Sequence, residues 1–306
     1  MKVSVIIPTY NRVSKLTNLL ISLENQTFKN FETVVVDDGS TDSTQFILLN
    51  RSSSLKKLKV FHQKNQGHAY SRNRGAKEAS GDLLIFFDSD VRPLPNCVER
   101  HFNYHLSNHK YILTGRSVMD DSLFQNSDVC QYRYYLESEI WSFPSYIGLC
   151  RVTSDNYFFS TQNLSLLKSL FITLGSFDES LKDSVDFDLC VRAMKQGIPI
   201  FYDHNTSVWH DDQGDLKSYV ERQIQYRKAR LHLAKKKPEY VLIIPNQFSQ
   251  GRNVWVNKLF GRFFVFNKIW KKILENRFYL TFFPKLLRFK LYGYIVHFSS
   301  IQNVKQ

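Results

Sequence analysis

Five consecutive apolar residues at positions 83–87 constrain the fold of this chain more than any other segment. A short apolar run of this kind is typical of a strand that is buried on both faces, as in a parallel sheet covered by helices. Asp88 and Asp90 follow the run directly. The sequence therefore places two carboxylates at the carboxyl end of a central strand, where open α/β sheets bind their ligands.

The same unit, an apolar strand next to an amphipathic helix, recurs along the first part of the chain. Strands are expected at residues 3–7, 33–36, 58–61 and 83–87, with helices at 16–23, after 42 and at 69–79. This alternation predicts an α/β fold with a doubly wound, mostly parallel sheet flanked by helices. Residues 130–159 are rich in aromatic side chains and have no clear period, whereas 183–196 predict a helix and 201 and 208–210 the last strands.

Positive charge is concentrated in the last third of the chain. Residues 216–306 contain 19 Lys and Arg against three Glu, a net charge of +16, and the rest of the 306 residues carries −3. Such asymmetry indicates an anionic partner. The four cysteines have no metal-binding or disulfide spacing and are expected to be reduced core residues. The start of the chain has no secretory signal pattern, and no apolar run approaches about 18 residues, so a cytoplasmic protein is expected.

Two parts of this basic segment have the spacing of amphipathic helices, which predicts a helical C-terminal extension. The first places Leu259, Phe263, Phe266, Trp270 and Ile273 on one face, with Lys258, Arg262, Lys268, Lys271 and Lys272 around it. The second begins near Pro284 and places Leu287, Leu291, Tyr294, Ile295 and Phe298 on one side, with Lys285, Arg288 and Lys290 nearby. Aromatic faces flanked by basic residues suit an anionic membrane surface, so residues 250–300 are expected to bind one. The alternative is packing on protein, and nucleic acid is not expected, because no binding motif accompanies the charge.

The Asp88-Ser89-Asp90 segment suggests a site for a divalent cation. Mg²⁺ and Mn²⁺ prefer carboxylate oxygens and complete their coordination with water and substrate phosphates. The sequence therefore favours chemistry on a diphosphate. The alternative for an isolated pair of aspartates is that they only end the strand.

Six segments in order along the chain strengthen the first interpretation. They are residues 3–12, 36–42, 65–75, 88–90, 175–179 and 186–192. Together they resemble the motifs of the nucleotide-sugar glycosyltransferases of family 2, which share the GT-A fold, over residues 3–212. The resemblance implies that 1–95 form the half that binds the nucleotide sugar and 96–215 the acceptor half, leaving 216–306 as the basic extension.

The resemblance also implies site residues. Those of the nucleotide site would be Pro8, Thr9, Tyr10, Arg12, Asp38, Arg72, Asp88 and Ser89. Asp90 would bind the metal, with Asp88 and His210 as further candidate ligands, and Asn163 and Asp188 would lie on the acceptor and sugar side. A structural histidine and a solvated helix arginine are the alternatives for His210 and Arg72, and Asp37 is expected to be a turn and capping residue.

Asp186 is the expected catalytic base, because a carboxylate within reach of the acceptor hydroxyl can take its proton. The family pattern has a glutamate where this chain has Val185, so Asp183 or Asp188 could serve instead. For Asp188, an ion pair with Arg192 four residues later is the structural alternative. A single base opposite the leaving group implies inversion at the anomeric carbon.

The expected enzyme is therefore an inverting, metal-dependent glycosyltransferase in cell-surface polysaccharide synthesis, attached to the inner face of the cell membrane. UDP is preferred over GDP or dTDP as the donor nucleotide, the acceptor is a glycan or a lipid-linked sugar, and a second copy of the chain is a further candidate partner. A nucleotidyltransferase is one alternative, although Pro8 to Arg12 stand where its glycine-rich loop would be. A non-catalytic nucleotide-sugar-binding protein is the other.

Overall fold

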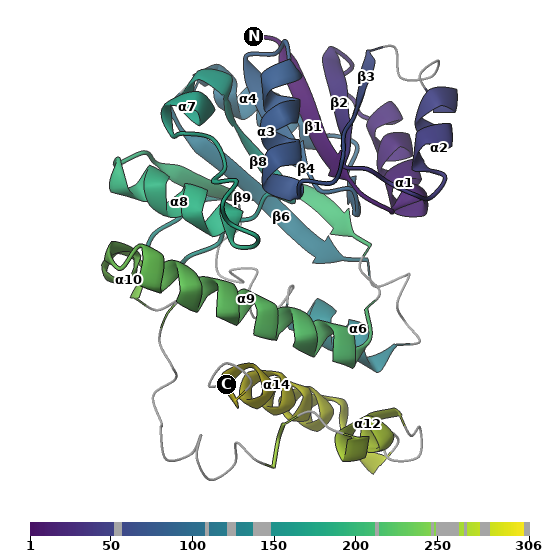
Figure 1. The fold of residues 1–306 in the computed structure, drawn as a ribbon, viewed down its shortest axis with the longest axis vertical. Helices are drawn as coiled ribbons and strands as arrows, with labels where there is room; N and C mark the ends of the chain where they lie inside the picture. Colours follow the sequence, from purple (N-terminus) through teal and green to yellow (C-terminus); the bar gives the residue numbers. More distant parts are fainter. Residues whose placement is uncertain are drawn as a thin grey trace. The chain divides into compact units, whose positions relative to one another are not determined.

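A computed structural model describes most of the chain as two compact units. The described residues are 1–51, 57–107, 110–120, 127–136, 148–211, 214–245, 248, 263–265, 268–275 and 282–302. One unit, which we call the sheet unit, comprises Met1–Asp120 and Leu136–Asp212. The other, the helical unit, comprises Asp121–Tyr135 and Gln213–Gln306. Figure 1 shows the elements of both.

The sheet unit is built on one mixed sheet. Its strands among the described residues are β1 (Val3–Thr9), β2 (Phe31–Asp37), β3 (Leu58–His62), β4 (Leu83–Phe87), β5 (Val91–Pro93), β6 (Ile112–Met119), β7 (Leu149–Arg151), β8 (Asn163–Leu167) and β9 (Ile200–His210). Their order is β3-β2-β1-β4-β8-β6-β9-β5, and β7 pairs with β9. Strands β3, β2, β1 and β4 are parallel, whereas β8 is antiparallel to both of its neighbours.

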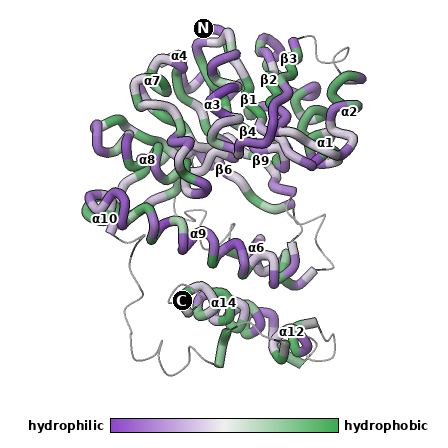
Figure 2. The backbone as a smooth tube through the Cα atoms, in the orientation of Figure 1, coloured by the Kyte–Doolittle hydropathy of each residue, from purple (hydrophilic) through white to green (hydrophobic). Residues whose placement is uncertain are grey.

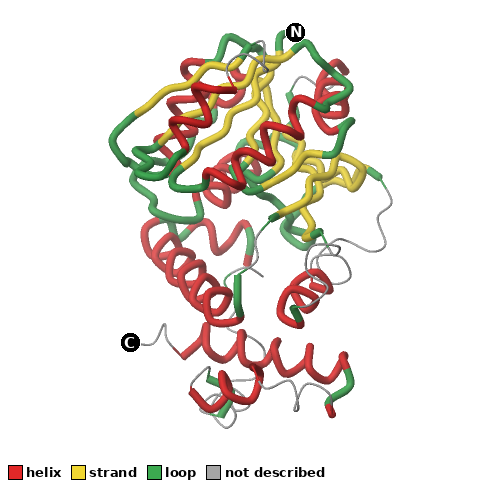
Figure 3. Tube along the Cα trace, turned by 90° about the vertical axis from the view of Figure 1, so that its right-hand side faces the viewer, coloured by secondary structure: helices red, strands yellow, loops and turns green. Residues whose placement is uncertain are grey.

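This sheet confirms the predicted α/β fold class and differs from the prediction in its second half. The segments around 201 and 208–210, expected as separate strands, are the two ends of the continuous strand β9. The helices of this unit are α1 (Val13–Glu24), α2 (Thr44–Arg51), α3 (His68–Glu78), α4 (Cys97–Ser107), α7 (Lys168–Thr173) and α8 (Val185–Lys195). Figure 3 shows red helices on both sides of the yellow sheet.

The two faces of the sheet bury different helices because side chains alternate along each strand. One apolar cluster joins Val5 of β1 and Ile85 of β4 to Leu19 of α1 and Val98 of α4. On the other face, Phe86 of β4 packs against aromatic rings of α7 and the loop after it. Both faces of β4 are therefore buried, as the apolar run predicts. The polar residues Asp88, Ser89 and Asp90 follow it at the carboxyl edge of the sheet.

A buried polar network joins α4 to β8. His101 Nε2 lies 2.7 Å from Asn163 Oδ1, His101 Nδ1 lies 2.7 Å from Ser165 Oγ, and His105 Nε2 lies 2.9 Å from Ser165 Oγ. The Asn163 amide nitrogen donates to two main-chain carbonyls, so its Oδ1 is an acceptor and His101 carries its proton on Nε2. Burial lowers the pKa of His101 to about 4, which keeps its ring neutral at pH 7.

The helical unit contains α6 (Asp128–Tyr135), α9 (Leu216–Lys236), α10 (Glu239–Ile243), α12 (Lys268–Glu275) and α14 (Lys285–Gln302). Asp128 of α6 accepts hydrogen bonds from Arg288 at 2.7 Å and from the Tyr292 hydroxyl at 2.8 Å, which fixes α14 against α6. The predicted helix after Pro284 is therefore α14. Of the other predicted tail helix, α12 covers the end, and Leu259 and Phe266 lie outside the described residues.

Two sequence-based expectations about the chain can be compared with the described residues. Cys97, Cys130, Cys150 and Cys190 are all buried and carry free thiols. The described helices include none that combines the length and the apolar content needed to cross a bilayer.

Candidate active site at the carboxyl ends of the strands

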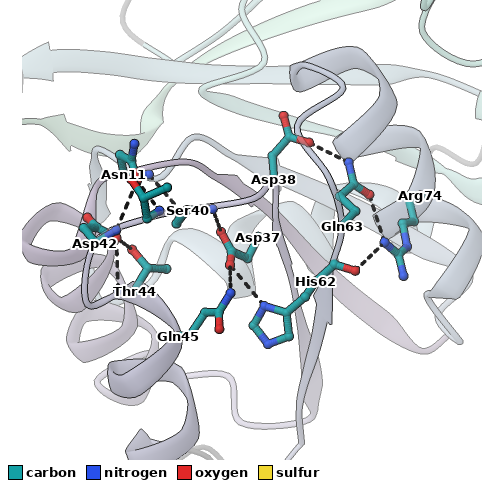
Figure 4. Close-up of polar contacts among 11 residues, drawn as sticks. Asn11, Asp37, Asp38, Ser40, Asp42, Thr44, Gln45, His62, Gln63 and Arg74 are labelled. Carbon is teal, nitrogen blue, oxygen red and sulfur yellow. Dashed lines mark hydrogen bonds and ion pairs between the residues drawn. The ribbon is translucent and has the colours of Figure 1, made fainter.

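Asn11 joins the loops that follow β1 and β2 through hydrogen bonds of its main chain and its side chain (Figure 4). Asn11 has a φ of 49°, a left-handed conformation that asparagine adopts more readily than most residues. Its main-chain N–H donates to Ser40 Oγ at 2.9 Å, and its Oδ1 accepts from the Thr41 N–H at 2.7 Å. The first two sequence motifs therefore form one hydrogen-bonded platform.

Asp37, the first acid of the second motif, stabilises this platform from inside. Its carboxylate is fully buried, accepts from the Ser40 N–H at 3.0 Å, and lies 3.0 Å from His62 Nδ1 (Figure 4). These contacts are the turn chemistry expected for Asp37.

Asp38, the second acid, holds the loop between β3 and α3. Its carboxylate accepts from the Gln63 side-chain amide at 2.7 Å and from the main-chain N–H groups of Gln66 and Gly67 at 2.9 and 2.8 Å. A Cβ on Gly39, whose φ is +82°, would lie 3.0 Å from the Asn65 nitrogen, so the two loops touch at backbone level. A carboxylate has about four acceptor positions, which leaves Asp38 room for one further donor.

The other predicted residues of the nucleotide site lie at the same edge. Pro8 and Thr9 end β1, opposite Val36 and Asp37 of β2. Tyr10 follows them with 46% of its surface exposed, and Ser89, after β4, is buried. Among the described residues the buried Thr9 Oγ1 has no hydrogen-bond partner, which is unusual for a buried hydroxyl. These side chains frame a surface with both apolar and polar groups.

Arg72 of α3 projects into this edge and pairs with Asp88. Its Nη2 donates to Asp88 Oδ1, and its guanidinium lies 5.8 Å from the Phe177 ring centroid. The side chain is buried, and within the described structure its Nε has no hydrogen-bond partner. His68 is close by, and burial together with the Arg72 charge lowers its pKa. The predicted solvated alternative for Arg72 is wrong, and its unused donor suits an anionic ligand.

Asp90 lies among cationic side chains at this edge. Its Oδ2 pairs with Arg12 Nη1 and lies 3.8 Å from His210 Nε2. Burial alone would raise the pKa of Asp90, but the hydrogen bond and charge of His210 and the charges of Arg12 and Lys15 outweigh burial and hold it well below its usual range. Asp90 is therefore ionised at neutral pH.

The donor set at Asp90 suits a divalent cation that shares its coordination with a substrate. Among the described residues, no three His, Cys, Asp or Glu side chains are gathered to hold a metal ion by themselves. Mg²⁺-type sites commonly use one or two protein ligands and complete the shell with water and phosphate oxygens. Asp90 and His210 meet that requirement. Asp88 contacts Arg72 instead. Its expected role as a metal ligand therefore has less support from the geometry than that of Asp90.

The structure adds residues that the sequence analysis missed. Gln162 Nε2 lies 3.2 Å from His210 Nε2, and it precedes β8, which pairs with β4. Arg92 of β5 donates to Asp211 at 2.8 Å and to Asp120 at 2.8 Å, and the Asp211 N–H donates to the Asp90 carbonyl at 2.8 Å. This ion-pair chain fixes the backbone on which Asp90 lies.

The three acids near the start of α8 differ in accessibility. Asp186 is partly exposed in the first turn, where its Oδ1 accepts from the Phe187 N–H at 2.8 Å. Asp183 is also partly exposed and contributes to the electrostatic environment of His68. Asp188 is fully buried and accepts from Arg192 at 2.7 Å. In this structure Asp188 forms the buried ion pair with Arg192 that is its structural alternative, and its acceptor-side role stays a prediction.

Asn163, the other residue expected on the acceptor and sugar side, is also buried. It is 1% exposed, and its amide donates to the carbonyls of Arg116 at 3.1 Å and Thr206 at 2.8 Å while its oxygen accepts from His101. A Cβ on Gly115 of β6 would lie 2.2 Å from Asn163 Nδ2, so the strand is glycine here to admit the side chain. Asn163 therefore connects β8 to α4 and to its neighbouring strands, and its acceptor-side role stays a prediction.

The third motif is connected to the fifth through Asn73 of α3. Its Nδ2 donates to the Phe177 carbonyl at 2.9 Å and to Glu179 at 2.8 Å, and its Oδ1 accepts from the Phe177 N–H at 3.0 Å. The loop begins with left-handed Gly175 and Ser176. Asn73 therefore fixes the loop between α7 and α8 next to Arg72.

Comparison with known proteins identifies the family of this chain. The model of the family described as glycosyl transferase family 2 matches residues 4–174. An uncharacterised glycosyltransferase of Bacillus subtilis, YfnE, is 28% identical over 65% of this chain and 62% of its own length. Another, RC0461 of Rickettsia conorii, is 45% identical over 67% of this chain and 35% of its own. The chain thus spans less than two thirds of these relatives.

Solved structures share the fold at low sequence identity. The mannosyltransferase PcManGT of Pyrobaculum calidifontis, in complex with GDP-Man and Mn²⁺, aligns with a TM-score of 0.66 and 15% identity over 100% of this chain and 88% of that chain. TarS of S. aureus, residues 1–349 in complex with UDP-GlcNAc, gives 0.55 and 21% over 98% and 90%. With a family model that matches more than half of its residues, the chain described here belongs to glycosyl transferase family 2.

Proposed function

We propose that this chain is an inverting, metal-dependent glycosyltransferase that moves a sugar from a nucleoside-diphosphate sugar to a hydroxyl group of a glycan or lipid-linked acceptor. In this proposal residues 1–95 bind the donor, 96–215 supply the acceptor side, and the product belongs to a cell-surface polysaccharide. UDP is the preferred nucleotide.

One observation carries the proposal: at one sheet edge Asp88 pairs with the buried Arg72, whose Nε has no hydrogen-bond partner among the described residues, and Asp90, two residues further on, is ionised. A diphosphate offers oxygens to the guanidinium, and a divalent cation offers charge to the carboxylate. The nearby Asp38 retains one acceptor position for a donor group on the nucleotide base. An edge that combines these features suits a nucleoside diphosphate with its cation.

Asp90 and His210 would hold the cation, which when bound neutralises charge on the departing diphosphate. Arg12 contacts Asp90 in the present structure. We propose that Arg12 turns to a phosphate oxygen when the donor binds, because the negative charge of the diphosphate then attracts its guanidinium group away from Asp90. Arg72 contacts a second phosphate oxygen through Nε.

The transfer step uses one carboxylate of α8. The acceptor oxygen forms a bond to the anomeric carbon as the bond from that carbon to the phosphate oxygen breaks, and Asp186 accepts the acceptor's proton. The electron pair of the broken bond leaves with the nucleoside diphosphate. A single attack from the side opposite the leaving group inverts the anomeric centre.

A donor screen tests this assignment. We expect UDP or a UDP-sugar, with Mn²⁺, to raise the melting temperature more than GDP or dTDP, because binding to the native state stabilises it. Release of nucleoside diphosphate should then require both the sugar donor and an acceptor hydroxyl. Release of pyrophosphate from a nucleoside triphosphate would instead show a nucleotidyltransferase, and donor binding without any turnover would show a binding protein.

Exposed apolar residues support membrane attachment by the helical unit. Ile269, Phe282 and Leu286 have 68%, 69% and 63% of their surface exposed, next to the exposed Lys272 and Lys285. The predicted apolar side of α14 divides: Ile295 and Phe298 are buried, whereas Leu287 and Tyr294 are 49% and 52% exposed. We propose that the exposed set enters the surface of an anionic bilayer on the inner face of the cell membrane, while the buried set packs the unit.

Flotation with liposomes that contain phosphatidylglycerol tests this attachment. Replacing Phe282 and Leu286 together by glutamate is expected to reduce bound protein about tenfold or more, because two apolar anchors are lost and two charges face an anionic surface. Leu242→Glu is the matched control, since Leu242 is 84% exposed in α10 of the same unit. Equal flotation of the double variant and the control would contradict membrane binding by this surface.

A further inference from the structure

The pairing between β6 and β9 is interrupted by a bulge within the sheet unit. Gly115 of β6 is paired with Asp203, and the next residue, Arg116, is paired with Ser207. Residues 204–206 of β9 therefore have no partner on β6. Bulges of this kind are frequent next to active sites, because they redirect side chains that a regular ladder would hold in place.

The bulge lies at the level of the sheet at which β4 ends. The Asn163 side-chain amide donates to the Arg116 carbonyl at 3.1 Å, and Asn163 is paired with Phe87, the last residue of β4. Asp88 follows Phe87 directly. The main chain of Arg116 is thus two strands away from β4, at the end of the sheet where the candidate active site lies.

Two side chains of the bulge have buried nitrogen atoms without a hydrogen-bond partner among the described residues. These atoms are Arg116 Nε and His204 Nδ1. Buried polar atoms are nearly always paired, so each of the two requires an explanation. The groups also interact, because burial, followed by the charge of Arg116, lowers the pKa of His204. The His204 ring is therefore neutral at pH 7, and a neutral imidazole can donate one N–H.

The acid next to His204 is already bound by other groups. Asp203 pairs with Arg100 at 2.8 Å and accepts from Thr206 Oγ1 at 2.5 Å. In the described part of the chain, Arg116 itself forms no ion pair. A guanidinium group that no carboxylate occupies, beside a neutral imidazole, offers N–H donors to an anion.

Arg116 lies on the side of the sheet that α8 covers. Burial raises the pKa of Tyr202 and the charge of Arg116 opposes this rise, so the two side chains are close. The Tyr202 ring lies 4.7 Å from that of Phe158, and the neighbouring Tyr157 lies 5.5 Å from Phe187 of α8. Figure 2 shows both green hydrophobic and purple hydrophilic residues along α8, as expected for a helix with one side against a sheet. The proposed base is in the first turn of this helix.

We propose that Arg116 and His204 bind a phosphate group of the acceptor substrate. The guanidinium fork would donate to two phosphate oxygens and the imidazole N–H to a third, whereas a carboxylate has only two oxygens to offer. This inference rests on the proposed function, which assigns residues 96–215 to the acceptor side. The phosphate belongs either to the carrier of a lipid-linked acceptor or to a phosphate ester in a soluble glycan.

Binding of inorganic phosphate to the full chain, with the donor site filled by UDP and Mg²⁺, tests the proposal. We expect phosphate to bind R116Q about tenfold or more weakly than the wild type, because charge-assisted hydrogen bonds are lost. H204Q should weaken binding by several-fold. R116K keeps the charge without the fork and should recover only part of the affinity, which keeps the test open if R116Q does not fold.

R151Q is the matched control, because Arg151 is an exposed arginine of β7, which also pairs with β9. It should bind phosphate as the wild type does. Equal losses in R116Q and R151Q would overturn the proposal in favour of diffuse charge. No saturable binding to the wild type, or a loss in R72Q with none in R116Q, would overturn it as well, since the second result places the phosphate in the donor site.

Two phosphate esters separate the two sources of phosphate. Farnesyl phosphate that binds more tightly than glycerol 3-phosphate, with both affinities reduced in R116Q, assigns the site to a lipid carrier. Equal affinities with the same dependence assign it to a glycan phosphate. Affinities for both esters that do not change in R116Q would contradict the site. UDP binding should be unchanged in R116Q. A wild type that binds no UDP, but binds phosphate in a manner that depends on Arg116, would contradict the proposed donor site and not this one.

Discussion

Replacing Asp186 by asparagine is expected to lower the turnover of a sugar donor by about 100- to 10,000-fold, the range that general-base catalysis contributes. The substitution preserves shape and removes only the proton acceptor. Binding of the nucleoside diphosphate should change little, because Asp186 is not among the groups that contact the nucleotide in the proposed site. Stopped turnover with intact nucleotide binding is the signature of a group that acts in the chemical step.

Local structure favours Asp186 over its neighbours. Asp188 is enclosed with Arg192, whose guanidinium also donates to the carbonyl of Ser176 at 2.6 Å. Asp183 and Asp186 remain partly exposed on either side of Ser184, which has a left-handed φ of 62°. That turn begins α8, so Asp183 precedes the helix and Asp186 lies in its first turn. Only one of these two carboxylates is expected to accept the acceptor's proton.

Asp183→Asn is therefore the matched control for Asp186→Asn. Both remove one partly exposed carboxylate within four residues of sequence, and both keep the side-chain size. We expect Asp183→Asn to retain turnover within about tenfold, because loss of a nearby charge has a smaller effect than loss of the base. The reverse result, a large loss only in Asp183→Asn, would transfer the role to Asp183. Full turnover in both variants would exclude Asp183 and Asp186 as the base.

The parallel half of the sheet could be predicted because its signals are local. Each strand up to β4 is a short apolar run, and each helix keeps its own period in the sequence. The long strand β9 was not predicted as one element, because Asp203 and Thr206 interrupt its apolar pattern. They are bound instead by Arg100, with Asp203 at 2.8 Å. The long helix α9 was missed for a related reason, since it buries only four side chains along 21 residues.

The candidate site also contains residues that could be predicted from the sequence and residues that could not. Asp38, Arg72 and Asp90 could be found because each follows or faces the end of a parallel strand. Gln162 and Arg92 could not, because they reach the site through the antiparallel pairings of β8 with β4 and of β5 with β9. The sequence also does not show whether a polar residue of a motif is buried, as Asp188 and Asn163 are.

Acidification from pH 7 to pH 5 is expected to lower the free energy of unfolding by about 2 kcal/mol through His101 alone. The folded-state pKa of His101 is about 4, because the ring is fully buried between Asn163 and Ser165. In the unfolded chain a histidine has a pKa of about 6.5. Since the folded pKa is the lower one, the unfolded chain binds the proton first. The contribution is complete above about pH 6.5 and is lost as the pH falls toward 4, about 3 kcal/mol in all.

Urea unfolding at pH 7 and pH 5 measures this loss, with His101→Gln as the test variant. The variant should be less stable at pH 7, because its amide cannot fill both contacts of the ring, and its stability should fall less between the two pH values. His232→Gln, which replaces an exposed histidine of α9, should keep the wild-type pH dependence.

Other titrating groups do not account for a loss of stability between pH 7 and pH 5 that depends on His101. Despite the burial of Glu32, its contacts with Lys59 and Ser4 lower its pKa to about 2, so its contribution to stability is lost only below about pH 4.5. His68 and His204 also have lowered pKa values, and their share remains in the variant. An unchanged pH dependence in His101→Gln would mean that the buried network tolerates a protonated ring, with Asn163 or Ser165 rearranged to accept from it.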